Sequence, residues 1–401
     1  MFTDIEEALN WLMARRNNSY SFEHFKMVCH EFGDLQNELY QIHVAGTDGK
    51  GSTVNYLSEL LRSQGFKVGT FTSPHYITHL DRIRINDQNI PEDVFLSILN
   101  QDMSFYLEND LSMFEIDYLI MCRYFLMENV DMAIIEVGLG GRLDSTNVVD
   151  HPVLSIITTI GYDHMDRLGN TLEAICREKC GIIKEDSQVL IGHLNEACRK
   201  IVEECASFHH CEFHALGDYT KLPERRFKYH DEEYKLASYA SYQVHNACLA
   251  LDALDILSTD YGFTIDREKA KEALAKALWR CRFEIVKEKP RVILDGAHNI
   301  HGIAALIESF DQFSGSKCII FSALQRKEFP AMANALKEHC DRLIITTFEN
   351  KEAISKEDLP DYEYDPSYEH AIDEAIRNYD NILICGSLYF LSDVVLKYKF
   401  E

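Results

Sequence analysis

Short apolar runs alternate with amphipathic segments along most of the chain. The apolar runs are typical of buried strands, and the segments between them place hydrophobic residues at the spacing of a helix face. Before residue 284 we expect strands at residues 42–45, 66–72, 131–138, 153–159 and 187–192, with helices at 3–16, 54–65, 114–128, 171–180, 194–206, 242–257 and 266–278. Because a strand, helix, strand order requires right-handed crossovers, this pattern predicts a mainly parallel sheet.

A second alternation begins after a charged stretch that contains Pro290. Its expected strands are residues 292–295, 317–321, 343–346 and 382–385, and its expected helices are 302–311, 329–339 and 368–378. This order predicts a smaller, second doubly wound sheet. With 401 residues the chain is too long for one ordinary core, so we predict an α/β protein with domains at 1–284 and 292–401 and a linker at 285–291.

A glycine-rich stretch joins the first expected strand to the helix after it. It reads Gly46-Thr47-Asp48-Gly49-Lys50-Gly51-Ser52-Thr53, and we call residues 46–52 the phosphate loop. Glycines let backbone N–H groups converge on an anion, a helix N-terminus adds partial positive charge, and Lys50 adds a full charge. The strict motif has Ser or Thr directly after Lys, whereas Gly51 intervenes here. We interpret the stretch as a variant nucleotide triphosphate site rather than a plain turn.

Polar residues follow several expected strands at their carboxyl ends, where ligands bind in open α/β sheets. They are Ser73, Glu136, His164 and Asp295. A carboxylate such as Glu136 is costly to bury without a cation, and Mg²⁺ prefers carboxylate oxygens. Ser73 alone is also typical of an ordinary turn, and a single histidine such as His164 is more often structural than a ligand. A shared edge with the phosphate loop favours the functional interpretation.

Composition narrows the class of partner and the location. A net charge of −25 argues against a nucleic-acid partner, which needs a basic surface. The acidic N-terminus is unlike a signal peptide, and no apolar run approaches the roughly 20 residues of a membrane helix. The 12 cysteines lack C-x-x-C spacing, which is typical of reduced thiols in the cytoplasm. The segment 205–214 holds two cysteines and three histidines, but its crowding favours a surface loop over a zinc site.

Taken in order, the motifs resemble the folylpolyglutamate synthase and dihydrofolate synthase branch of the Mur ligase family. The resemblance spans most of the chain and is carried by residues 43–53, 72–75, 82–86, 114–115, 136–147, 161–164, 168–184, 243–250, 282–284, 295–299 and 386–389. It implies an N-terminal P-loop ATPase domain and a C-terminal Rossmann-like domain with ATP in a cleft between them. The implied reaction joins L-glutamate to a carboxylate of a pteroate or folate through an acyl phosphate.

The resemblance also implies roles for individual residues. ATP would be bound by Thr47, Asp48, Gly49, Lys50, Gly51, Ser52, Asn246, Arg282 and Asp295, and two Mg²⁺ ions by Ser73, Glu136 and His164. Lys179 matches a lysine that carbon dioxide converts to a carbamate, and with Lys50 and His298 it completes the catalytic set. Ser387 matches a position near glutamate, and the pteridine segments contain Phe114, Glu115, Asp144 and Thr146.

Several positions depart from the family pattern. Asp48 stands where asparagine is usual, Tyr242 replaces a histidine, Cys281 a glycine, Ile300 a proline and Asp117 a threonine. The phosphate and metal residues are all kept, so the departures concern the pteridine and glutamate preferences. Two alternatives remain open: a Mur-type ligase acting on a cell-wall precursor, and a nucleotide-binding regulator without catalysis. We expect a monomer that binds small molecules and neither nucleic acid nor membrane.

Overall fold

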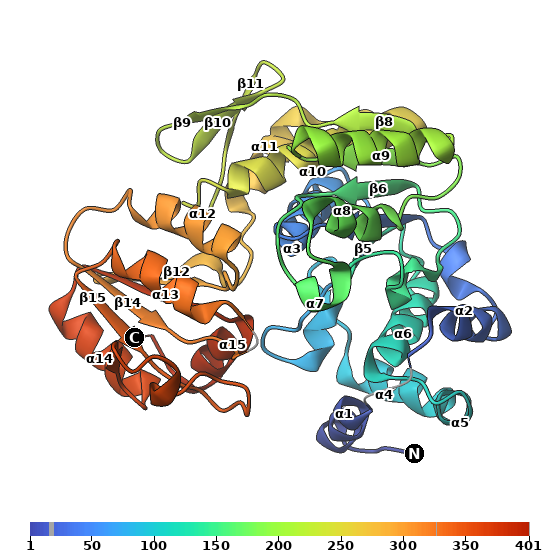
Figure 1. Ribbon diagram of the computed structural model, residues 1–401. Helices are drawn as coiled ribbons and strands as arrows, with labels where there is room; N and C mark the ends of the chain where they lie inside the picture. The colour runs from blue at the N-terminus through green and yellow to red at the C-terminus, as the bar shows by residue number, and fades with distance from the viewer. Residues whose placement is uncertain (16–19, 326, 401) are drawn as a thin grey trace. The chain divides into compact units, whose positions relative to one another are not determined.

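The computed structural model describes residues 1–15, 20–325 and 327–400, and it contains two compact units (Figure 1). The first comprises Met1–Asp218 and Asn246–Leu274, and the second comprises Tyr219–His245 and Ala275–Glu401. Contacts therefore group residues 219–245 with the second unit, whereas the sequence placed them in the first domain. The expected linker at 285–291 contains the end of one strand and the Lys289-Pro290 turn of a hairpin, which explains its charge and its proline. The domain boundaries stay a prediction.

The first unit is built on an eight-stranded sheet in the order β4-β3-β2-β5-β1-β6-β7-β8. Its strands are β1 (Gln41–Ala45), β2 (Val68–Phe71), β3 (Ile83–Ile85), β4 (Gln88–Asn89), β5 (Met132–Glu136), β6 (Leu154–Ile157), β7 (Gln188–Ile191) and β8 (Glu212–Ala215). All pairings are parallel except those of β3 with β2 and β4. The mainly parallel sheet is confirmed, and β1 lies between β5 and β6.

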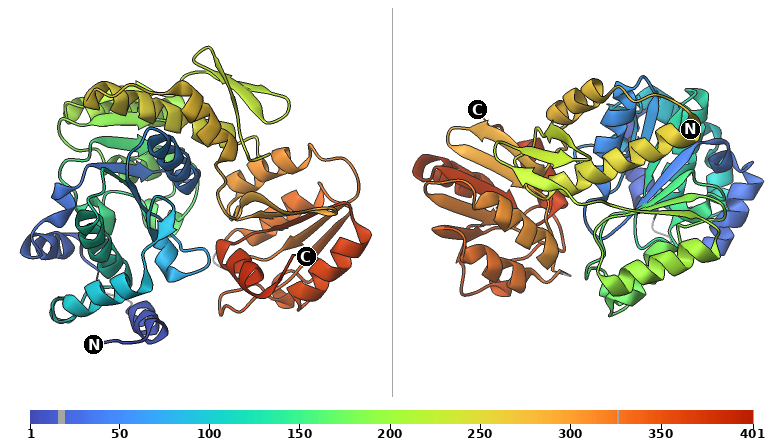
Figure 2. Two further views of the ribbon diagram at one scale, coloured as in Figure 1. Left: turned by 180° about the vertical axis from the view of Figure 1, so that it is seen from behind. Right: turned by 90° about the horizontal axis from the view of Figure 1, so that it is seen from above.

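Helices cover both faces of this sheet. They are α1 (Ile5–Ala14), α2 (Phe22–Glu31), α3 (Lys50–Ser63), α4 (Glu92–Gln101), α5 (Met103–Glu108), α6 (Met113–Met127), α7 (Met165–Leu168), α8 (Leu172–Cys180), α9 (Glu196–Phe208), α10 (Gln243–Tyr261) and α11 (Arg267–Lys276). Short 3-10 turns occur at Leu35–Glu38, His79–Arg82 and Ser145–Val148. Figure 2 (right) shows α9 and α10 on opposite sides of the strands. Apolar side chains of α6 pack with Phe71 and Ile135, and those of α8 and α9 with Ile157 and Val189.

The second unit has a six-stranded sheet in the order β12-β13-β17-β14-β15-β16 and a separate sheet in the order β11-β10-β9. The strands are β9 (Thr220–Leu222), β10 (Arg226–Tyr229), β11 (Glu232–Lys235), β12 (Arg282–Glu288), β13 (Arg291–Asp295), β14 (Lys317–Phe321), β15 (Arg342–Ile345), β16 (Glu363–Tyr364) and β17 (Asn381–Cys385). In the larger sheet β12 alone is antiparallel to its neighbour.

Two layers of helices enclose the larger sheet of the second unit. They are α12 (Ile300–Phe310), α13 (Phe329–Lys337), α14 (Tyr368–Asn378) and α15 (Leu388–Lys397), with a 3-10 turn at Lys356–Asp358. Apolar residues of α12 and α13 form one core with Ile293, Phe321 and Leu383. Figure 2 (left) shows α12 on one side of the strands and the red helices α14 and α15 on the other. The predicted Rossmann-like arrangement is confirmed.

The structure bears on two expectations from the composition, one about membrane-spanning segments and one about the cysteines. Among the described residues no helix is both long enough and apolar enough to cross a membrane. All twelve cysteines are free thiols. Within the part of the chain that the structure describes, the cysteines and histidines of residues 205–214 do not gather into a group that could hold a metal ion.

Candidate active site

The phosphate loop connects β1 to α3, as the sequence indicated. Gly49 directly precedes the first helical residue, Lys50, and has φ +84°, a conformation that side chains strain to adopt. A Cβ at Gly49 would lie 2.4 Å from Asn246 Oδ1, and one at Gly46 would lie 1.8 Å from Thr158 Oγ1. Both glycines are thus required by close packing. The loop ends at a helix N-terminus, whose partial positive charge favours an anion.

The loop is held in place by the segment that follows β6. Thr47 N donates to Thr159 O at 2.9 Å, and Asp48 N donates to Thr159 Oγ1 at 3.0 Å. The Thr158 hydroxyl donates to Asp48 O at 2.6 Å. Thr47 Oγ1 donates to Gly161 O at 3.1 Å and accepts from Gly161 N at 2.9 Å. These bonds fix the loop backbone before any ligand binds.

Two lysines meet on one carbonyl of the phosphate loop. Lys50 Nζ lies 3.0 Å from Gly46 O and 3.2 Å from Thr47 O, and Lys179 Nζ lies 2.8 Å from the same Gly46 O. Lys179 comes from α8 and is 4% exposed. Burial, reinforced by the charge of Lys50, lowers the pKa of Lys179 to about 7. Near neutral pH a large share of this amine is therefore uncharged and nucleophilic.

Two of the predicted metal ligands lie together at the same edge of the sheet. Glu136 is the last residue of β5 and is 5% exposed. Its Oε2 accepts a hydrogen bond of 3.2 Å from Ser73 N, which follows the neighbouring strand β2. The structure thus brings Ser73 and Glu136 into contact beside β1, the strand that delivers the phosphate loop.

His164 follows β6, on the other side of β1 from Glu136. The two strands are two spacings apart, about 10 Å. His164 adopts φ +50° at the start of α7, and its Nε2 lies 3.8 Å from Asp163 Oδ2. The negative charges of Asp48 and Asp163 raise the pKa of Lys179 and so offset part of the lowering that burial causes. Asp163 was not among the predicted site residues, although it directly precedes His164.

The predicted pteridine residues Phe114 and Glu115 lie in the first turn of α6. Glu115 is a capping residue, because its Oε2 accepts from Ser112 N at 2.7 Å and from Ser112 Oγ at 2.5 Å. The Phe114 ring stands against the glycine loop after β5, since a Cβ at Gly138 would lie 2.9 Å from it.

Asp144 and Thr146 form a buried hydrogen-bonded chain with His43 of β1. Asp144 accepts from Leu139 N at 2.7 Å and from the Thr146 hydroxyl at 2.6 Å. Thr146 Oγ1 in turn lies 2.8 Å from His43 Nε2. Burial raises the pKa of Asp144 and lowers the pKa of His43 to about 3, so His43 is neutral. The chain orders the loop after Gly138, and His43 is a member that the sequence did not single out.

In the second unit, Asp295 ends β13 and is 1% exposed. It accepts from the Tyr242 hydroxyl at 2.5 Å, from Phe283 N at 2.8 Å and from Ala297 N at 2.9 Å. Burial raises the pKa of this carboxyl, while Arg282 acts in the opposite direction. Tyr242, a departure from the family pattern, is therefore a direct partner of a predicted ATP residue.

His298 and Ser387 follow the adjacent parallel strands β13 and β17. His298 Nδ1 lies 2.9 Å from Gly296 O, and Ser387 precedes the first residue of α15. A Cβ at Gly296 would lie 2.2 Å from Leu388 Cδ2, so the two loops pack against each other. Ile300 occupies the first position of α12, where proline is also well accommodated because the N–H there has no helical acceptor.

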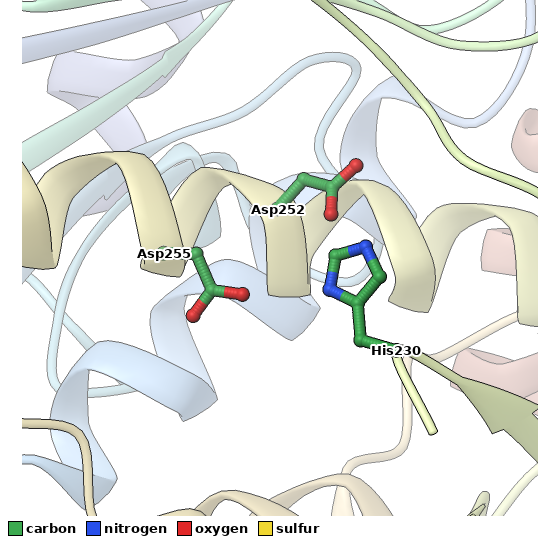
Figure 3. A group of neighbouring side chains, drawn as sticks. All are labelled: His230, Asp252 and Asp255. Atoms are coloured by element: carbon green, nitrogen blue, oxygen red, sulfur yellow. The ribbon is translucent and has the colours of Figure 1, made fainter. Parts of the chain in front are cut away.

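Figure 3 shows three further side chains that carry potential metal-ligand atoms, His230, Asp252 and Asp255. Asp252 and Asp255 lie on α10 in the first unit, and His230 belongs to the second. Because the group draws on both units, it does not define a site within either one.

The comparisons with known proteins point to one family. A model described as the Mur ligase middle domain matches residues 44–253, and one described as the Mur ligase, glutamate ligase domain matches residues 281–388. A Bacillus subtilis (strain 168) protein named dihydrofolate synthase/folylpolyglutamate synthase is 33% identical, with 100% of both chains covered. A Lacticaseibacillus casei protein named folylpolyglutamate synthase is 28% identical, with 92% of each chain covered.

Solved structures agree over nearly the whole length. The apo form of L. casei FPGS superposes with a TM-score of 0.88 at 25% identity, covering 98% of this chain and 99% of that one. E. coli FolC in complex with DHPP and ADP superposes with a TM-score of 0.89 at 27% identity, covering 98% and 97%. The fold, the phosphate loop and these matches define an ATP-dependent ligase, and its co-substrate is ATP. The chain belongs to the folylpolyglutamate synthase/dihydrofolate synthase branch of the Mur ligase family.

Proposed function

We propose that this ligase joins the amine of L-glutamate to a carboxylate of dihydropteroate or a folate. A carboxylate oxygen of the acceptor bonds to the γ-phosphorus of ATP, and the bond to ADP breaks. The glutamate amine then attacks the acyl carbon and loses a proton, and phosphate leaves with that oxygen. The names of the relatives support the substrates, and they favour neither a cell-wall precursor nor a regulator without catalysis. The observation that carries the proposal is the meeting of Lys50 and Lys179 on the Gly46 carbonyl.

The phosphate loop would bind the triphosphate of ATP. Phosphoryl transfer requires positioning and charge neutralisation more than a covalent nucleophile. The backbone of Thr47, Asp48, Gly49, Gly51 and Ser52 and the ammonium of Lys50 supply both, because the loop is already ordered by its bonds to Thr158 and Thr159. Asn246, packed against Gly49, would contact the nucleotide from α10, and Arg282 and Asp295 are the further ATP residues that we propose.

The residues at the sheet edge fit magnesium. Glu136 presents a buried carboxylate next to Ser73, and hard cations prefer such oxygens. Ser73 and Glu136 would hold one ion, and Glu136 with His164 a second. Magnesium bound there would neutralise phosphate charge.

Lys179 would carry a carbamate. Its low pKa leaves an uncharged amine near neutral pH, whose nitrogen can bond to the carbon of CO₂ with loss of one proton. The product is an anion, which relieves the repulsion between Lys179 and Lys50. Buried Lys179 thus changes from a like-charged neighbour of Lys50 into its counter-ion.

The acceptor and glutamate would use different parts of the chain. Phe114, in the first turn of α6 that Glu115 caps, offers a ring for the pteridine, beside the loop that Asp144 and Thr146 order. His298 and Ser387 would serve the glutamate side. We further propose a cytoplasmic monomer without nucleic-acid or membrane partners. The net charge of −25 supports the first of these absences, because a polyanion such as nucleic acid binds to a basic surface.

The test uses the purified protein with ATP, Mg²⁺, L-glutamate and either dihydropteroate or tetrahydrofolate. We expect ADP release that requires both glutamate and one of the pteridine acids, and the active acid shows which reaction is catalysed. Lys50→Ala should remove most turnover, whereas Lys67→Ala, which deletes a surface lysine paired with Glu128, should not. ADP release that needs neither substrate, or no release at all, would refute the proposal.

A further inference from the structure

The segment from Thr72 to Arg82 forms a closed loop. Thr72 N donates to Arg82 O at 2.9 Å, which joins its two ends. Inside the loop, the Asp81 carboxylate accepts from the backbone N–H groups of Tyr76, Ile77 and Thr78 at 2.8–3.1 Å. One end carries Ser73, which is held by Glu136. The other end contains the 3-10 turn at His79–Arg82.

This second end is attached to α6 by a buried cluster of polar groups. Asp117 of α6 is fully buried, and its Oδ1 lies 2.8 Å from His79 Nε2. Its Oδ2 lies 3.7 Å from Arg82 Nε. His79 and Arg82 are themselves 5% and 6% exposed. Asp117 is therefore the group on α6 that contacts both His79 and Arg82.

The cluster is costly to bury, because several of its polar atoms have no hydrogen-bond partner. They are His79 Nδ1, Arg82 Nε and Asp117 Oδ2. Buried ion pairs are often no more stabilising than apolar packing, and their best attested use is to fix one arrangement of the chain. We therefore attribute to Asp117 a role in fixing the position of the His79–Arg82 turn rather than in stabilising the fold.

Arg82 links the cluster to the ring that we assign to the pteridine. Its guanidinium carbon lies 6.0 Å from the centre of the Phe114 ring, and its Nη2 lies 3.5 Å from His75 Nδ1. Phe114 is three residues before Asp117 on α6, so both lie on the same side of the helix. A shift of the Arg82 side chain would therefore change what Phe114 contacts, whereas Ser73 keeps its own bond to Glu136.

We propose that Asp117 is a positioning residue for the acceptor substrate: it holds the His79–Arg82 turn on α6 and thereby sets Arg82 and Phe114 for the pteridine. This inference rests on the proposed function. Ser73 has a separate anchor in Glu136, and that bond does not involve Asp117. Loss of the Asp117 charge should therefore weaken binding of the pteridine acid and leave ATP binding unchanged.

The kinetic test compares Asp117→Asn and Asp117→Thr with the wild-type enzyme. Asparagine keeps an acceptor for His79 Nε2 but loses the charge that faces Arg82. We expect KM for the pteridine acid to rise at least tenfold in both variants, with KM for ATP within twofold and kcat within threefold. Asp102→Asn is the matched control, because Asp102 pairs with Arg123 of α6 and lies outside residues 72–82. Its KM values should not change.

A second measurement needs no substrate. Hydrogen exchange of the Tyr76, Ile77 and Thr78 amides should be at least tenfold faster in Asp117→Asn than in the wild type or Asp102→Asn. If Asp117→Asn does not fold, His79→Gln, which keeps an N–H donor for Asp117, should retain the wild-type KM, and His79→Ala should raise it. Unchanged exchange, unchanged KM in folded variants, or equal rises of both KM values would overturn the inference. Lack of wild-type turnover with pteridines would instead refute the proposed function and leave the exchange result to decide.

Discussion

Replacing Lys179 by methionine should stabilise the protein at neutral pH while abolishing ligase activity. Lys179 is almost completely buried, and its ammonium competes with Lys50 for the Gly46 carbonyl. Methionine has a similar shape and no charge to desolvate. The substitution therefore separates the effect of the buried lysine on the free energy of unfolding from its role in ligase activity.

The size of the effect follows from the pKa. Burial lowers the pKa of Lys179 from 10.5 to about 7, which corresponds to a cost of roughly 5 kcal/mol when the amine is protonated in both the folded and the unfolded state. Methionine loses the hydrogen bond to Gly46 O, about 1 kcal/mol. Below pH 7 the variant should thus be more stable than the wild type by about 4 kcal/mol.

The sign of the pH dependence is fixed by the same shift. Between pH 7 and 10.5 the unfolded wild-type chain binds the lysine proton and the folded chain does not, so wild-type stability rises with pH relative to the variant. The difference in unfolding free energy should shrink by about 3 kcal/mol between pH 6 and 9.5. Urea unfolding in CO₂-free buffers at several pH values measures it.

Lys184→Met is the matched control. Burial lowers the pKa of Lys184 to about 8, and this lysine donates to Asn147 O rather than to the phosphate loop. Its variant should keep ligase activity, and its stability difference should shrink only above pH 8. A Lys179→Met protein that is no more stable than the wild type at pH 6, or a stability gap independent of pH, would refute the reasoning.

Three further substitutions test other parts of the site. Gly49→Ala, with a Cβ 2.4 Å from Asn246 Oδ1, should raise KM for ATP at least tenfold. Gly65→Ala, at a similar positive φ in open space, should lower the free energy of unfolding in urea by only about 1 kcal/mol and leave KM unchanged. Equal effects of the two substitutions would contradict the close packing of Gly49 against Asn246 as the reason for the glycine. Glu136→Gln should lower kcat about a hundredfold and raise the Mg²⁺ concentration for half-maximal rate, which a magnesium titration measures; an unaltered titration would remove Glu136 from the metal site. Asp295→Asn should raise KM for ATP about tenfold, and an unchanged KM would limit Asp295 to a structural role.

The central strands were predictable because parallel strands buried on both faces are almost continuously apolar. Residues 131–138 and 153–159 illustrate this, and they contain β5 and β6. The short strands β3 and β4 were not predicted, and the strand-like pieces expected between residues 207 and 240, where β9–β11 lie, had no predicted bounds. Several expose their side chains and are defined by their partners rather than by their own pattern. Their pairing is tertiary, so local sequence carries little signal for it.

In the site, too, residues that are consecutive in the sequence were predictable, and contacts between distant residues were not. The phosphate loop was visible because its glycines, lysine and helix start are consecutive in the sequence. The contact of Lys179 with Gly46, 133 positions away, has no local signature and entered only through the family resemblance. The bond between Tyr242 and Asp295 was missed because a departure from the family pattern does not reveal its partner.

The most direct test of the account follows one oxygen atom. The enzyme is supplied with a pteridine acid whose reacting carboxylate carries ¹⁸O, together with ATP and L-glutamate, and the phosphate released is analysed by mass spectrometry. Transfer through an acyl phosphate predicts one ¹⁸O atom in phosphate for each amide formed. Amide formation with unlabelled phosphate would contradict the account.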